Sequence, residues 1–213
     1  MKKLIKNGFV IDGSGEKRYK ADVLVNGDKI EKIGAIDNIE GAEVIDATGK
    51  IVAPGFIDTH SHSDLKVLIE PFIEPKLRQG ITTEILGQDG ISMAPLPKEF
   101  VSSWRKNLAG LDGDSDLLSW DWETTDKYLD LIAKTGSGPN ELYLVPHGNI
   151  RMEAMGLEAR VATDEELAKM RDITRREMEA GAAGLSTGLI YIPCAYSDTR
   201  ELVEICKVAA EYD

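Results

Sequence analysis

An apolar segment that runs directly into two histidines constrains this chain more than any other stretch. The segment reads Ile51-Val-Ala-Pro-Gly-Phe-Ile-Asp-Thr-His-Ser-His62, which is typical of a buried strand that ends in polar residues. Side chains two positions apart on a strand point to the same face, so we expect His60 and His62 to lie side by side. Two adjacent imidazoles form half of a metal site. The pattern therefore predicts a metal-dependent hydrolase, because a bound divalent ion activates water at neutral pH.

The composition is that of an ordinary soluble globular protein and excludes several other classes. The 213 residues are 42% hydrophobic and 29% charged, and 25 Lys and Arg against 37 Asp and Glu give a formal net charge of −12. This acidic balance argues against nucleic acid as a partner. No apolar run approaches the ~20 residues that span a bilayer, and no signal-peptide pattern opens the chain, so we expect no membrane association and a cytoplasmic location. The two cysteines lack metal-ligand spacing.

The first fifty residues carry the pattern of short antiparallel strands. Ala21–Val25 and Lys29–Ile33 flank Asn26-Gly27, which is a strong signal for a tight hairpin. Glu43–Asp46 predicts a further strand before the histidine segment. We therefore expect a small all-β region over residues 1–54.

After residue 55 the pattern alternates between strands and helices, which predicts a parallel sheet or barrel. Strands are expected at Thr82–Leu86, Leu142–Val145 and 184–190, and Thr163 opens a helix with a capping box. The stretch from about 93 to 140 interrupts this alternation, and insertions of this kind often overhang an active site. Its acidic run at 112–116 lacks the closing glutamate of a calcium loop, so we expect a solvated loop there.

Five stretches in this order resemble the amidohydrolase superfamily, and specifically its N-acyl-D-amino-acid deacylase (D-aminoacylase) branch. They are Val52-Ala-Pro-Gly-Phe-Ile-Asp-Thr-His-Ser-His-Ser-Asp64, Leu77-Arg-Gln-Gly-Ile-Thr-Thr83, Gly87-Gln-Asp-Gly-Ile-Ser-Met-Ala-Pro95, His147-Gly-Asn-Ile-Arg151 and Gly184-Leu-Ser-Thr-Gly-Leu-Ile-Tyr-Ile-Pro193. The resemblance implies an α/β fold: residues 1–54 would supply strands of a small β-sandwich. Residues 55–213 would form about four β/α units, the N-terminal part of a (β/α)₈ TIM barrel.

The resemblance also implies the metal ligands. In the family pattern the two histidines of the first barrel strand bind metal, a role carried here to His60 and His62. The second strand contributes Asp89, where many D-aminoacylases have a cysteine; a carboxylate also binds zinc, and the alternative is an aspartate that stabilises the turn. We expect one or two divalent ions, with zinc as the first choice. Asp58 is expected to orient a ligand histidine without touching the metal, and Asp64 receives no role.

Three further residues are candidates for contact with the substrate. Tyr191 follows the fourth expected strand and resembles a family residue that contacts the carboxylate or acyl group, with packing beneath its loop as the alternative. His147 ends the third strand on the same side and would line the pocket or serve as a structural histidine. Arg151 is suited to bind a carboxylate through two hydrogen bonds, or else forms a surface ion pair.

The family's remaining ligand histidines and its general-base aspartate are expected beyond residue 213. We therefore expect the chain to be an incomplete fragment, inactive alone, whose C-terminal half barrel lies in the same or a second polypeptide. The function implied is hydrolysis of the linear amide bond of small N-acyl-D-amino acids (EC 3.5.1 class). The alternatives are a cyclic-amide amidohydrolase similar to dihydropyrimidinase or dihydroorotase, disfavoured because 184–190 contains no lysine, and a non-catalytic half-barrel partner.

Overall fold

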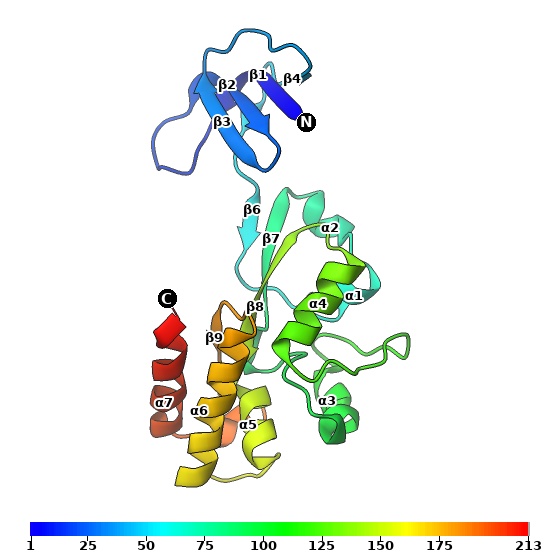
Figure 1. The fold of residues 1–213 in the computed structure, drawn as a ribbon, viewed down its shortest axis with the longest axis vertical. Helices are drawn as coiled ribbons and strands as arrows, with labels where there is room; N and C mark the ends of the chain where they lie inside the picture. The colour runs from blue at the N-terminus through cyan, green and yellow to red at the C-terminus, as the bar shows by residue number, and fades with distance from the viewer. Residues whose placement is uncertain (213) are drawn as a thin grey trace. The chain divides into compact units, whose positions relative to one another are not determined.

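The computed structural model describes residues 1–212, which form two compact units, Met1–Gly55 and the part from Phe56 onwards. The first unit is a sheet of five strands: β1 (Lys2–Val10), β2 (Tyr19–Asn26), β3 (Lys29–Gly34), β4 (Glu43–Asp46) and β5 (Ile51–Val52). The strand order is β3-β2-β1-β4, and β5 also pairs with β1 (Figure 1). Leu4 and Leu24 are buried on one face of this sheet, and Val10 and Val23 contribute to a second apolar cluster.

The predicted hairpin forms between β2 and β3, but the expectation of purely antiparallel strands is wrong. Asn26 pairs with Lys29, so the two-residue turn is Gly27-Asp28. β4 and β5 instead run parallel to β1, with Leu4 opposite Val44 and Phe9 opposite Ile51. The reason is that the chain returns along 35–42 after the hairpin and re-enters the sheet in the direction of β1.

The second unit contains the predicted parallel sheet. Its strands are β6 (Phe56–Asp58), β7 (Ile81–Leu86), β8 (Asn140–Pro146) and β9 (Gly184–Ser186), and their spatial order follows the chain (Figure 1). All three neighbouring pairs are parallel. Parallel strands in sequential order with helical crossovers are the arrangement of a (β/α)₈ barrel. The α/β fold class is therefore confirmed for this part of the chain.

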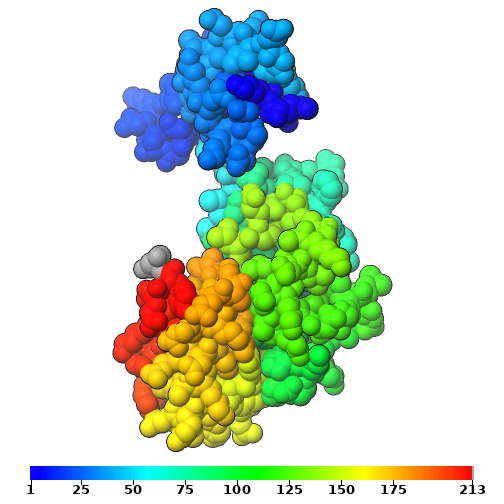
Figure 2. Space-filling view, viewed as in Figure 1, coloured from blue at the N-terminus to red at the C-terminus, as the bar shows by residue number. Residues whose placement is uncertain are grey.

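Helices connect and follow these strands. They are α1 (Lys66–Ile69), α2 (Glu74–Leu77), α3 (Val101–Leu108), α4 (Thr125–Thr135), α5 (His147–Met155), α6 (Asp164–Glu179) and α7 (Thr199–Ala209), with 3₁₀ turns η1 (Gln88–Gly90), η2 (Lys98–Phe100), η3 (Cys194–Tyr196) and η4 (Ala210–Tyr212). The predicted capping box is present at α6: Thr163 and Glu166 each accept from the other's backbone N–H. α6 and α7 pack side by side, as the yellow-orange and red surfaces of Figure 2 show. Within residues 1–212, no helix combines the length and apolar character needed to cross a membrane.

The interruption expected over about 93–140 is more ordered than the sequence suggested. It contains α3, and its last part is α4, the crossover helix that leads into β8. Trp104 of α3 and Trp122 are almost fully buried, and Tyr128 of α4 packs against Trp122 and against Tyr143 of β8. Burial of these large aromatic side chains fixes the insertion against the sheet.

The outer strands of the parallel sheet differ from expectation. β6 was expected to be a buried strand, yet Phe56 is 63% exposed and Ile57 is 61% exposed. β9 ends at Ser186 although a longer strand was expected, and Ile190 beyond it is 85% exposed. β6 and β9 are the edges of the sheet in the described residues, so each lacks a neighbour on one side.

Candidate metal centre

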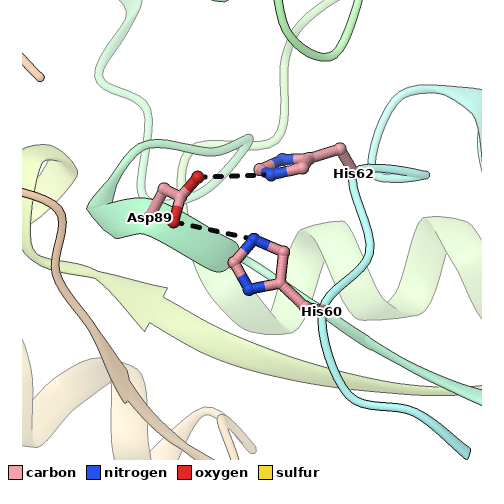
Figure 3. A group of neighbouring side chains, drawn as sticks. All are labelled: His60, His62 and Asp89. Carbon is pink, nitrogen blue, oxygen red and sulfur yellow. Dashed lines mark ion pairs between the residues drawn. The ribbon is translucent and has the colours of Figure 1, made fainter.

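The two histidines of the apolar segment meet Asp89 beyond the carboxyl ends of β6 and β7. β6 ends at Asp58, so His60 and His62 lie on the loop that follows the strand rather than on the strand itself. The Nε2 atom of His60 is 3.7 Å from Asp89 Oδ1, and Nε2 of His62 is 3.3 Å from Asp89 Oδ2. Figure 3 shows both rings turned toward the same carboxylate. The structure thus brings together the three residues predicted as metal ligands.

A tight turn after β7 directs the Asp89 side chain at the histidines. Asp89 itself has a left-handed backbone (φ 58°), a conformation that aspartate tolerates better than most residues. Gly87 precedes it with φ 75°, and a Cβ there would lie 2.0 Å from the Leu144 carbonyl oxygen. Only glycine therefore permits the turn to approach β8 this closely.

The donor set and its spacing fit a zinc-like ion. The ligand atoms of His60, His62 and Asp89 all lie within 4.8 Å of one another. Two imidazole nitrogens and one carboxylate oxygen at ~2.0–2.2 Å from a tetrahedral ion would be about 3.4 Å apart. The separations of 3.7 Å from His60 to one Asp89 oxygen and 3.3 Å from His62 to the other are each close to that value. The His60 side chain is 58% exposed, which leaves one side of the group open to further ligands.

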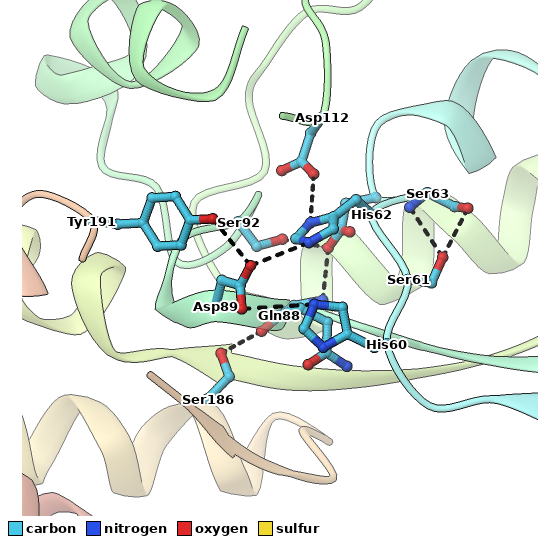
Figure 4. Close-up of polar contacts among 12 residues, drawn as sticks. His60, Ser61, His62, Ser63, Gln88, Asp89, Ser92, Asp112, Ser186 and Tyr191 are labelled. Carbon is cyan, nitrogen blue, oxygen red and sulfur yellow. Dashed lines mark hydrogen bonds and ion pairs between the residues drawn. The ribbon is translucent and has the colours of Figure 1, made fainter. Parts of the chain in front are cut away.

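Buried hydrogen bonds hold the turn that carries Asp89. The carboxylate of Asp64 is fully buried, and its Oδ1 accepts from Gly87 N–H at 2.7 Å and from the Ser92 hydroxyl. The Gln88 side chain donates to the Thr59 carbonyl at 2.9 Å, which ties the turn to the histidine loop. Figure 4 shows Gln88 and Ser92 beside the candidate ligands. Asp64, which received no role from the sequence, therefore braces the turn.

Tyr191 reaches the same site from the segment after β9. Its hydroxyl donates to Asp89 Oδ2 at 3.4 Å (Figure 4). The nearby Asp89 carboxylate, together with partial burial, raises the pKa of Tyr191. The phenol therefore stays protonated at neutral pH and presents a hydrogen-bond donor beside the ligands.

His147 and Arg151, the other two candidates for substrate contact, lie elsewhere. Both are completely buried: His147 Nε2 is 2.7 Å from Glu201 Oε1, and the Arg151 guanidinium binds the other oxygen of Glu201. The Nδ1 atom of His147 pairs with the Thr187 hydroxyl at 2.9 Å. These contacts place both residues in a buried ion-pair network, so neither faces a substrate in this structure. A surface ion pair for Arg151 is also wrong, because its partner is buried with it.

Asp58 contacts the histidine loop through its backbone. Its Oδ1 accepts from His60 N–H at 3.2 Å, and its Oδ2 pairs with Lys76 at 2.5 Å. The hydrogen bond from Lys76 lowers the pKa of Asp58, although burial opposes the shift. Asp58 thus shapes the loop as a charged residue but does not touch an imidazole ring.

The ring of His62 instead meets Asp112, a residue that sequence reasoning missed. Asp112 Oδ1 lies 3.2 Å from His62 Nδ1, and the Asp112 side chain is fully buried. The expectation of a solvated loop holds for Asp114 and Asp116, which pair with Arg105 near the surface, but not for Asp112. Burial, with the carboxylates of Asp64 and Asp89 nearby, raises the pKa of Asp112. In the sequence, Asp112 was distinguished only by its place in the acidic run at 112–116.

Comparison with known proteins places these features in a family. The chain is 38% identical over 204 residues to a D-aminoacylase of Alcaligenes xylosoxydans xylosoxydans, covering 96% of this chain and 41% of that protein. It is 39% identical over 207 residues to an N-acyl-D-glutamate deacylase of the same organism, covering 97% and 41%. The chain thus spans about two fifths of the length of these curated relatives.

Structural comparison agrees with the sequence relatives. The N-acyl-D-glutamate deacylase of Bordetella bronchiseptica, solved with zinc and a phosphonate inhibitor that mimics the tetrahedral intermediate, superposes with a TM-score of 0.88 at 38% identity. The match covers 98% of this chain and 42% of that one. The model of the amidohydrolase family matches residues 43–212, which include all the candidate ligands. On this match, the chain belongs to the amidohydrolase family.

Proposed function

We propose that this chain supplies the metal-binding N-terminal part of a zinc-dependent hydrolase that deacylates N-acyl-D-amino acids. The observation that carries the proposal is the convergence of His60, His62 and Asp89 at the carboxyl ends of two parallel strands. Active sites of (β/α)₈ enzymes lie at that end of the barrel. The deacylase relatives, one of them solved with zinc, support the choice of metal and reaction.

Each residue of the site has a distinct part in this proposal. His60, His62 and Asp89 would hold the ion, which when bound activates water and polarises the carbonyl of the scissile amide. Tyr191 keeps its proton beside Asp89 and would donate a hydrogen bond to the substrate. A general base must take the proton from the attacking water and then deliver it, as the conjugate acid, to the leaving nitrogen; we assign this role to an aspartate outside residues 1–213.

The parallel sheet β6-β7-β8-β9 is not closed, which supports the proposal that further strands complete it. In a closed barrel every strand has two neighbours, whereas within residues 1–212 β6 and β9 each have one. The apolar side chains of Phe56, Ile57 and Ile190 are exposed along this incomplete sheet. We propose that four more β/α units, in the same or a second polypeptide, cover them and complete the site.

Zinc binding tests the assignment of the metal ligands, on which the rest of the proposal depends. Titration of the chain with Zn²⁺ against a chromogenic chelator should show a site that is lost in His60→Ala and in His62→Ala. Lys66→Ala, an exposed change shortly after the histidine loop, should leave the affinity unchanged. Equal affinity in all four proteins would contradict the assignment of the ligands.

Activity requires the complete barrel and tests the substrate class. With the remaining half present, N-acetyl derivatives of D-amino acids should be hydrolysed and their L-enantiomers should not. His62→Ala should abolish this hydrolysis together with zinc binding. Hydrolysis of a cyclic amide in place of the linear substrates would instead support the dihydropyrimidinase-like alternative. The expected cytoplasmic location stays a prediction.

A further inference from the structure

The imidazole of His62 lies between two carboxylates, one at each ring nitrogen. Nε2 is 3.3 Å from Asp89, the candidate ligand, and Nδ1 is 3.2 Å from Asp112. Figure 4 shows Asp112 approaching the ring from the side opposite Asp89. A neutral imidazole has one N–H and one lone pair, and a metal binds only the nitrogen with the lone pair. The choice between the two nitrogens therefore decides whether His62 can be a ligand.

We propose that Asp112 is a positioning residue that makes this choice. As an ionised carboxylate, Asp112 accepts a hydrogen bond from Nδ1–H at 3.2 Å, which keeps the proton away from Nε2 and leaves that lone pair directed at the group formed with His60 and Asp89. It also fixes the rotation of the ring, because the hydrogen bond is satisfied in only one orientation. Partners of this kind raise metal affinity without touching the ion.

The insertion holds Asp112 rigidly in place for this role. Asp112 lies in the turn after α3, and its N–H donates to the carbonyl of the fully buried Leu108, the last residue of that helix, at 2.9 Å. Beyond it, Arg105 of the same helix binds both Asp114 and Asp116, which closes the loop back on α3. The Asp112 carboxylate thus has little freedom to leave the ring.

The energetics of Asp112 also favour a functional role over a purely structural one. Its second oxygen, Oδ2, is buried without a hydrogen-bond partner among the described residues. A buried carboxylate oxygen left unpaired destabilises a fold. Residues that cost stability in this way concentrate at functional sites.

His60 provides a contrast within the same site. In the part of the chain that the structure describes, no hydrogen bond reaches its Nδ1, and its side chain is 58% exposed. The hydrogen bonding therefore constrains the two histidines unequally. His62 is the candidate ligand that a hydrogen bond orients and His60 is the less constrained one, so loss of Asp112 should act through His62 alone.

The inference rests on the proposed metal site. The test is designed to distinguish failure of the Asp112 role from failure of the metal site itself. Zn²⁺ affinity is measured for the chain and for Asp112→Ala, Asp112→Asn and Asp116→Asn, the last a matched change in the same loop at a side chain that is 94% exposed. We expect Asp112→Ala to weaken zinc binding by ~10–100-fold. Asp112→Asn, which keeps an acceptor oxygen, should recover part of that loss, and Asp116→Asn should match the unaltered chain.

The tautomer of His62 provides a second measurement that needs no metal. The chain has three histidines, so long-range ¹H–¹⁵N spectra of the metal-free protein can be assigned with His60→Gln and His62→Gln. We expect His62 protonated at Nδ1 in the unaltered chain and at Nε2, or at both nitrogens in exchange, in Asp112→Ala. The tautomer of His62 in the unaltered chain tests the role of Asp112 even if Asp112→Ala fails to fold.

The possible outcomes distinguish the role of Asp112 from the existence of the metal site. Unchanged zinc affinity in a folded Asp112→Ala, or an Nε2-protonated His62 in the unaltered chain, would overturn the role of Asp112 while leaving the metal site intact. Absence of zinc binding in the unaltered chain, or binding indifferent to His60→Ala and His62→Ala, would instead overturn the proposed function itself.

Discussion

The buried ion-pair network around Glu201 allows a direct test of what stabilises the second unit, from Phe56 onwards. Glu201 on α7 is 1% exposed, and its carboxylate binds the Arg151 guanidinium and His147 of α5, both fully buried. Removing one member of a buried ion pair leaves an uncompensated charge in a medium that solvates it poorly, at a cost of ~3–5 kcal/mol. We therefore expect Glu201→Leu to lower the free energy of unfolding by about 3–5 kcal/mol.

The measurement is urea denaturation followed by far-UV circular dichroism. With a slope of ~2 kcal/mol per M urea, the expected loss moves the midpoint down by about 2 M. Glu204→Gln on the same helix is the matched control, because its partners Arg171 and Lys207 lie at the surface. Such exposed pairs contribute at most about 1 kcal/mol, so this midpoint should move little.

A double variant separates buried charge from lost packing. In Glu201→Leu/Arg151→Met both charges of the pair are replaced by apolar groups of similar size, which is often neutral or stabilising for a buried pair. We expect it to recover most of the loss seen in Glu201→Leu. A Glu201→Leu midpoint equal to that of Glu204→Gln, or no recovery in the double variant, would refute the reasoning.

Three further predictions concern titration and ligand chemistry. Burial disfavours charged His147, but the hydrogen bonds that the protonated ring makes to Cys194 and Glu201 outweigh it and raise the pKa to about 9. The stabilisation from charged His147 is therefore full below pH 6.5 and is lost as pH rises through 9; the free energy of unfolding, measured by urea denaturation, should fall by about 3 kcal/mol across that range. Burial raises the pKa of Glu141 from 4.5 to about 7, so the fold loses stability as pH rises from 4.5 to 7 and the loss is complete above 7. Glu141→Gln should therefore add about 1 kcal/mol at pH 8 but not at pH 4; equal gains at both would contradict this. Asp89→Cys should retain metal binding and give Co²⁺ a thiolate charge-transfer absorption, while its left-handed backbone costs about 1 kcal/mol of stability; no such band would exclude position 89 as a ligand.

Local pattern predicted the proximity of two candidate ligands, and a family resemblance added the third. The apolar lead-in and the one-residue spacing predicted that His60 and His62 lie together, whereas Asp89 was named only through the resemblance to the D-aminoacylase branch; the structure brings the three together. These inferences succeed because the carboxyl ends of neighbouring parallel strands always meet at the same edge of the sheet. Even the error about β6, which ends before the histidines, left this proximity intact.

Local sequence pattern did not predict contacts between residues that are distant in the sequence. His147 and Arg151 looked available for a substrate because nothing nearby reveals that Glu201, about fifty residues later, binds both. Asp112 is likewise fifty residues from His62. Its contact depends on the path of the insertion, which is set by the burial of Trp104 and its neighbours rather than by any motif. Burial of a polar side chain is a tertiary property that residue type alone does not show.

The candidate ligands lie on loops, so their precision comes from hydrogen bonds between the ends of successive strands. Asp64, after β6, holds the backbone of Gly87 after β7, and the Ser186 hydroxyl at the end of β9 accepts from Gly90 N–H at 3.1 Å and donates to the Gly87 carbonyl. Each bond joins one β/α unit to another. A change in any of these buried groups should therefore displace Asp89 without touching a ligand. The sheet brings the loops together, whereas this buried network sets the distances between their side chains.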